Sequence, residues 1–134
     1  VDTIEFGCLF GSVDDFETMA AGNIMRDAGY TTIMRADSDA ASGGVDLFTA
    51  GVRRIVEDGA TFRVHAWTAG DGTTADQFQP CPGHPQHAST VEYLNRMLGD
   101  PTGADFYCFT ISFGEWPLHI MDADEIALYK LATE

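Results

Sequence analysis

Polar and apolar residues alternate along several short stretches of the chain, which is the pattern of half-buried β-strands. The clearest stretch covers residues 3–10, and Gly11 ends it. Shorter stretches over residues 31–35 and 61–67 follow the same pattern. The residues that share one face of the first stretch are Ile4, Phe6, Cys8 and Phe10. The first half of the chain is therefore predicted to contain three strands.

Apolar residues spaced three or four positions apart predict helices after the first two of these strands. The first helix is expected to open at Ser12, which with Asp15 resembles a capping box, and to stop at Gly29. A second helix is predicted over residues 45–58. The expected buried stripe of the first helix is Val13, Phe16, Ala20 and Ile24, and that of the second is Phe48, Val52, Ile55 and Val56.

The second half of the chain contains one more amphipathic helix and a longer apolar run. Ser89 and Glu92 have the spacing of a capping box, which predicts a helix over residues 89–98. Residues 105–113 are apolar on both faces, and this pattern favours an interior strand that is covered on both sides. The helix is expected to bury Val91, Leu94 and Leu98.

The C-terminal residues predict a hairpin followed by a helix. A short strand over residues 118–121 would pair with the preceding apolar strand. Asp122 and Glu125 again have capping-box spacing, which favours a helix over residues 122–132. A last strand over the same residues is the alternative.

Strands and helices thus alternate, which predicts an α/β fold with a mostly parallel central sheet of about five strands. Helices are expected to pack on the sheet, with the C-terminal hairpin and the terminal helix completing the fold. Residues 1–134 are expected to form a single domain, which is long enough to bury a core. No motif along the chain points to a family.

Acidic residues outnumber basic residues 21 to 7, which gives a net charge of −14 with Lys130 as the single lysine. Such a charge repels nucleic acid and anionic membranes, and it attracts basic partners or cations. No apolar run approaches the roughly 20 residues that span a bilayer. We therefore expect no direct nucleic-acid binding and no membrane insertion. The alternative is that the acidity only keeps the protein soluble.

The three cysteines are an odd number at wide spacing, which does not suggest a disulfide framework. Cys8 and Cys108 lie in apolar runs, where a buried and unreactive thiol is expected. No secretory signal is visible at the start of the sequence. A reducing compartment, the cytoplasm, is therefore the predicted location.

The longest segment without periodicity, residues 67–87, contains a candidate zinc site. Cys81, His84 and His87 offer one thiolate and two imidazoles within seven residues, a set that suits Zn²⁺. The fourth ligand would be His65, Asp71, Asp76 or a water molecule. The alternative is a rigid polar loop whose histidines cap the following helix or face solvent.

A second candidate site follows from the topology, because ligands of open parallel sheets bind beyond the carboxyl ends of the strands. Four predicted loops at that edge carry carboxylates, which could hold a divalent cation such as Mg²⁺. Turn and helix-cap chemistry alone also explains acidic residues in such loops. A nucleotide site is not expected, because no phosphate-binding motif is present. The carboxylates belong to Asp14, Asp37, Asp39, Asp71 and Glu115.

The sequence thus favours a small acidic binding or inhibitory protein that docks on a basic partner, possibly one that itself binds nucleic acid. A metal-dependent enzyme is the first alternative, and a component of a larger assembly or homo-oligomer is the second. Carboxylates gathered on one face would support docking, whereas carboxylates interspersed with arginines would not. The candidate docking residues are Asp14, Asp15, Glu17, Asp37, Asp39, Asp71, Glu115 and Trp116.

Overall fold

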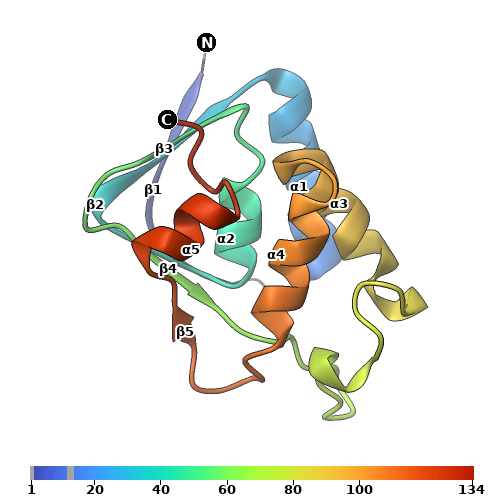
Figure 1. Cartoon of the computed structure of the whole chain (residues 1–134). Helices are drawn as coiled ribbons and strands as arrows, with labels where there is room; N and C mark the ends of the chain where they lie inside the picture. The colour runs from blue at the N-terminus through green and yellow to red at the C-terminus, as the bar shows by residue number, and fades with distance from the viewer. Residues whose placement is uncertain (1, 12–13) are drawn as a thin grey trace.

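The computed structural model describes residues 2–11 and 14–134, which form a five-stranded, mostly parallel sheet with five helices (Figure 1). The predicted α/β class is confirmed. The strands are β1 (Thr3–Phe10), β2 (Thr31–Ala41), β3 (Arg53–Val56), β4 (Thr61–Val64) and β5 (His119–Ile120). The helices are α1 (Asp15–Ala28), α2 (Gly43–Phe48), α3 (Ala88–Leu98), α4 (Thr102–Ile111) and α5 (Ala123–Leu128).

The sheet is built around β2, which pairs in parallel with β1 on one side and with both β3 and β4 on the other. β3 lies against the first half of β2 and β4 against the second half, so the two short strands follow one another along the same neighbour. β5 completes the sheet by pairing antiparallel with β4. The carboxyl ends of β1, β2 and β4 therefore meet at one edge of the sheet.

Strand β2 is longer than the predicted strand over residues 31–35, because the expected turn after it is a bulge inside the strand. The pairing of β1 with β2 shifts between Phe6 and Cys8, where a single residue of β1 faces four residues of β2. The Ser38 hydroxyl fastens this bulge by donating to the Phe6 carbonyl oxygen and accepting from the Arg35 amide at 2.8 Å. Asp37 and Asp39 therefore lie within β2, and the predicted crevice loop at these residues is wrong.

The prediction of a second helix over residues 45–58 is wrong after residue 48. Helix α2 ends at Phe48, and the chain turns back to form β3. Gly51 lies so close to Thr32 of β2 that a side chain at this position would overlap it. The apolar spacing in this segment fits a strand as well as a helix, and pairing with β2 decides the outcome.

Residues 105–113 form most of helix α4 and not the predicted interior strand, so the predicted C-terminal hairpin is also wrong. Buried Phe106, Tyr107 and Ile111 face the core, and the remaining apolar residues are partly covered. A run that is apolar on both faces satisfies a buried helix as well as a buried strand. Gly103 allows the helix to approach the α3 backbone at Leu94, where a Cβ atom would overlap.

Helix α1 is confirmed as an element, but its buried face differs from the predicted stripe. Gly22 and Met25 are buried, whereas Phe16, Ala20 and Ile24 are exposed. The glycine leaves room for the Tyr93 ring of α3. Ser12 of the predicted cap and Val13 of the predicted stripe lie outside the described residues. The helix is capped by Asp14, whose carboxylate accepts hydrogen bonds from the backbone amides of residues 16 and 17.

Two further predictions concern capping boxes. The box at Ser89 does not form, because a short turn of 3-10 helix at Pro85–His87 runs directly into α3 and places Ser89 inside the helix. The box of Asp122 and Glu125 does form and opens α5, so the helix prediction for the C-terminal residues is confirmed over α5. Among the described helices, none is both long and apolar enough to cross a membrane.

The core lies between the sheet and helices α1 to α4, with Phe48, Phe62 and Phe106 completely buried (Figure 1). A buried arginine, Arg54, joins the C-terminal residues to this core. Its guanidinium donates to the carbonyl oxygens of Lys130 and Leu131, both at 2.9 Å. Burial lowers the pKa of Arg54 to about 10.

Candidate functional site

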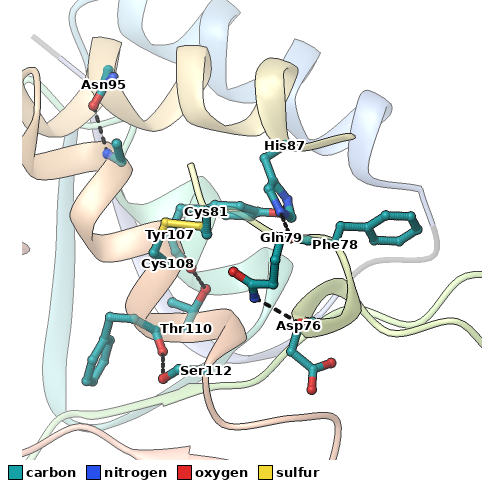
Figure 2. The surroundings of a disulfide bond; sticks show 12 residues. Asp76, Phe78, Gln79, Cys81, His87, Asn95, Tyr107, Cys108, Thr110 and Ser112 are labelled. Carbon is teal, nitrogen blue, oxygen red and sulfur yellow. Dashed lines mark hydrogen bonds between the residues drawn. A yellow bond between two sulfur atoms is a disulfide. The ribbon is translucent and has the colours of Figure 1, made fainter. Parts of the chain in front are cut away.

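The predicted zinc loop is fastened to helix α4 by a disulfide bond between Cys81 and Cys108 (Figure 2). Cys81 is therefore not a free thiolate, and the predicted zinc ligand set of Cys81, His84 and His87 is lost. The expectation of no disulfide and of a buried Cys108 thiol is wrong for the same reason. Cys8, the remaining cysteine, is exposed.

Both histidines of the predicted zinc set have structural hydrogen bonds. The His84 Nδ1 atom accepts from the Gln86 amide at 3.1 Å, so this ring caps the short helical turn. His87 is completely buried, and its Nε2–H donates to the Phe78 carbonyl oxygen at 2.7 Å. Its Nδ1 atom then accepts from the Tyr107 hydroxyl at 2.7 Å. Within residues 2–11 and 14–134, no three His, Cys, Asp or Glu side chains are placed to hold a metal ion.

Tyr107 connects this loop to the edge of the sheet. Its oxygen also accepts from the Trp67 Nε1–H at 3.0 Å, so a continuous chain of hydrogen bonds runs from Trp67 through Tyr107 to His87. Burial raises the pKa of the Tyr107 hydroxyl, which keeps it a donor. These hydrogen bonds hold the loop rigidly, in agreement with the alternative of a structural polar loop. The loop supports one side of a pocket.

The pocket lies at the carboxyl edge of the sheet, between α1, α2, α4 and the end of β4. Its volume of about 50 Å³ admits one small chemical group. Pockets for whole cofactors or drug-sized ligands are several times larger, roughly 300–1,000 Å³. The polar and aromatic side chains that line it include Asp15, Ser42, Asp46, His65, Trp67 and Tyr107.

Asp46 is the most perturbed acid of the pocket. Burial, and secondarily the negative charge of Asp15, raises the pKa of the Asp46 carboxyl from 3.8 to about 7. Asp46 has intermediate exposure and lines the pocket, so solvent in the pocket reaches its carboxyl group. This carboxyl accepts no hydrogen bond from the part of the chain that the structure describes. Asp46 therefore combines partial desolvation with a carboxyl that opens onto the pocket.

Two further titratable groups flank Asp46. His65 donates from Nδ1 to the Ala66 carbonyl oxygen at 2.7 Å. The Tyr93 hydroxyl donates to the backbone carbonyl oxygen of Asp46 at 2.9 Å and ties α2 to α3. Burial and the Asp46 charge raise the pKa of Tyr93, so the hydroxyl stays protonated.

One of the predicted docking residues, Asp15, lines this pocket, and others lie in the segments that follow β1 and β4 or precede β5. Asp14, Asp15 and Glu17 occupy the start of α1. Asp71 lies in the loop after β4. Glu115 and Trp116 lie in the segment before β5, which is held at this edge by a 2.6 Å hydrogen bond from the Ala66 amide to the Gly114 carbonyl oxygen. We call the following residues the acidic edge: Asp14, Asp15, Glu17, Asp46, Asp71, Asp76 and Glu115.

Asp37 and Asp39 do not join the acidic edge. Asp37 is exposed in the bulge of β2. Asp39 pairs with Arg63 of β4 at 3.0 Å. A second pairing, of Arg35 with Glu5 at 3.0 Å and Glu57 at 2.9 Å, joins β1, β2 and the end of β3.

Basic residues are absent from the segments that form the acidic edge. Residues 1–25, 36–52, 64–95 and 97–129 contain neither lysine nor arginine. Figure 1 shows both chain termini at the end of the sheet away from these loops. Five of the seven basic residues lie near the ends of α1 and α3, in β3 or near the C-terminus. They are Arg26, Arg53, Arg54, Arg96 and Lys130.

The sequence pattern suggested His65 only as a possible fourth zinc ligand and gave Asp46 no place in either candidate site. A usable signal exists, because Asp46 is an acid in the otherwise small and apolar segment of residues 43–48, just after a strand. The chain matches no protein-family model, and no curated protein matches it either.

Proposed function

We propose that this protein binds a basic partner, and that the partner docks on the acidic edge. The observation that carries this proposal is the segregation of charge along the chain: the segments that hold the acidic edge contain no lysine or arginine, and Arg63 near the carboxyl end of β4 is paired with Asp39. A face of one sign steers and selects an oppositely charged partner.

The arginines of the chain support this proposal because they are used within the fold. Arg26 and Arg54 donate to backbone carbonyl oxygens. The other four pair with carboxylates that lie outside the acidic edge: Arg35 with Glu5 and Glu57, Arg53 with Glu134, Arg63 with Asp39, and Arg96 with Asp27. None of these pairs neutralises an acid of the acidic edge.

Exposed aromatic residues at the same edge supply apolar contact area for a partner. Phe10, Phe16 and Trp116 are 64%, 74% and 78% exposed. Phe10 ends β1, Phe16 lies in the first turn of α1 beside Asp15 and Glu17 in sequence, and Trp116 follows Glu115. Aromatic anchors within a charged rim are a common composition of protein interfaces.

Titration of a fluorescently labelled lysine-rich peptide, followed by anisotropy at rising salt, tests the proposal. We expect affinity to fall as salt rises, because exposed charges are screened beyond about 8 Å at 0.15 M. Neutralising three acids of the acidic edge should weaken binding by about tenfold at low salt. These changes are Glu17→Gln, Asp71→Asn and Glu115→Gln.

The matched control neutralises three exposed acids away from the acidic edge: Asp2→Asn, Asp58→Asn and Asp100→Asn. It has the same net charge as the first variant and should bind the peptide nearly as well as the natural protein. Equal losses in both variants, or an affinity that salt does not change, would contradict docking at the acidic edge. Mass spectrometry of proteins that co-purify would then identify the natural partner.

The disulfide bears on where this binding occurs. Structural disulfides persist in oxidising compartments and are rare in the cytoplasm. The Cys81–Cys108 bond therefore supports a non-reducing compartment over the cytoplasmic location expected from the cysteine count.

Acid–base catalysis in the pocket is a second candidate function, and it is favoured by a specific observation. The pKa of Asp46 is raised to about 7, and the His65 ring lines the same pocket. Groups that titrate near the working pH suit general acid–base catalysis. A panel of ester, amide and glycoside substrates tests this alternative, and turnover that Asp46→Asn abolishes would support it.

A further inference from the structure

We propose that the pocket within the acidic edge binds one primary alkylammonium group, such as the side chain of a lysine that the basic partner presents. This inference rests on the proposed function, since it assigns the part of the partner that enters the pocket. The observation behind it is the pocket itself, with a carboxyl that opens onto it and apolar walls.

The Asp46 carboxyl opens onto the pocket and has no hydrogen-bond donor among the residues that the structure describes. A carboxylate whose hydration is incomplete is stabilised by a donor of opposite charge. The described residues give this carboxyl no hydrogen bond, and the nearby charge of Asp15 is also negative. A cation that enters the pocket would supply both the missing donor and the missing positive charge.

The pocket walls fit an alkyl chain that ends in the cation. Val45, Val64 and Ile111 line it with apolar surface. The methylene groups of a lysine pack on such surface while the ammonium group reaches polar atoms. Trp67 and Tyr107 add aromatic rings, which attract cations placed over their faces.

Size and donor geometry favour ammonium over guanidinium. A volume of about 50 Å³ holds a compact head group. The ammonium group is compact and has three donors, whereas guanidinium is a wide plane that prefers two acceptors side by side. The Ser42 and Thr90 side chains also line the pocket and offer hydroxyl acceptors beside the carboxylate.

Binding of the cation should strengthen as Asp46 loses its proton. Asp15 of α1, His65 after β4, Tyr93 of α3 and Tyr107 of α4 surround this group. With the pKa of Asp46 at about 7, its ionised fraction rises about tenfold between pH 6 and pH 8.

The test is an NMR titration of the full chain with n-butylammonium chloride, with sodium chloride as the ionic control. Trp67 lines the pocket and Trp116 is exposed outside it, so their two indole N–H signals form an internal comparison. We expect a saturable shift of the Trp67 signal alone, tighter at pH 8 than at pH 6. Asp46→Asn should weaken binding by about tenfold or more, and the surface control Asp58→Asn should not.

Two other ligands test which head group the pocket prefers. Neutral n-butanol should bind much more weakly than n-butylammonium, and methylguanidinium should bind more weakly as well. The proposal is overturned if Asp46→Asn binds n-butylammonium as well as the natural protein does. It is equally overturned if butanol matches the amine, if methylguanidinium binds more tightly, or if the Trp67 signal does not move.

These outcomes separate the pocket from the docking face. n-Butylammonium enters only the pocket. Its binding therefore does not depend on the surrounding carboxylates that would dock a peptide. If peptide binding proves independent of the acidic edge while n-butylammonium still binds, the proposed function fails and the pocket assignment remains. If peptide binding depends on the edge but no amine enters the pocket, the pocket assignment alone fails.

Discussion

Replacing Asp46 with asparagine should stabilise the protein above neutral pH, because it removes a carboxylate that folding places in a costly position. The pKa of Asp46 rises from its ordinary value of 3.8 to about 7 in the folded protein. At about 1.36 kcal/mol per pKa unit, a rise of this size costs about 4 kcal/mol once both states are ionised. The side chain opens onto a pocket that water can enter, so we expect about 2–4 kcal/mol.

The sign of the pH dependence follows from proton binding in the two states. Below pH 3.8, Asp46 is protonated in both the folded and the unfolded protein and has no effect. Between pH 3.8 and pH 7, only the unfolded chain releases the proton, so stability falls as pH rises. Above pH 7 the carboxyl is ionised in both the folded and the unfolded protein, and the full loss of folding free energy remains. The gain from Asp46→Asn should therefore grow through this interval and then level off.

Urea denaturation in phosphate buffer, followed by tryptophan fluorescence, measures this effect. Between pH 5, which is above the isoelectric point near 4.3, and pH 8.5, the advantage of Asp46→Asn should grow by about 2 kcal/mol. Asp58→Asn removes the same charge from an exposed turn and should show no such growth. Amine buffers must be avoided, because an amine that binds the pocket would mask the cost.

A stability difference that stays constant from pH 5 to pH 8.5 would refute the reasoning, even if the variant is more stable. A loss of stability at every pH would do the same, since it would show that the carboxylate has a favourable partner. Asp15→Asn provides a second check. Because the Asp15 charge contributes to the raised pKa, this variant should lower the upper limit of the pH-dependent interval of Asp46 and so narrow it.

Two further predictions concern the loop beside the pocket. Removing the Cys81–Cys108 bond with Cys81→Ser and Cys108→Ser should lower the free energy of unfolding, measured with denaturant, by about 3–4 kcal/mol, as expected for a separation of 27 residues. Cys8→Ser should have little effect. Tyr107→Phe should cost about 1–3 kcal/mol, because His87 Nδ1 loses its buried donor; an unchanged melting temperature would contradict that hydrogen bond.

The sequence by itself determined the elements whose patterns allow only one structure. The strand over residues 3–10, the end of the first helix at Gly29 and the capping box of Asp122 appear in the structure. The predicted buried faces do not, because Cys8 and Phe10 of the strand and Phe16 and Ile24 of the helix are exposed. The sequence also determined the distribution of charge along the chain, since the long segments without lysine or arginine are visible before any folding. Local patterns were sufficient in these cases because the interactions involved are local.

Only the tertiary structure decided the features that depend on distant neighbours. Residues 105–113 satisfy a buried strand and a buried helix equally, and packing on α3 through Gly103 selects the helix. The spacing of the three cysteines contains no information on which pair will meet, because α4 and the long loop come together only in the folded protein. Asp46 is one acid among 21 in the sequence. It becomes distinctive only when α1, α2 and α4 close around it, because desolvation depends on what surrounds a group in space.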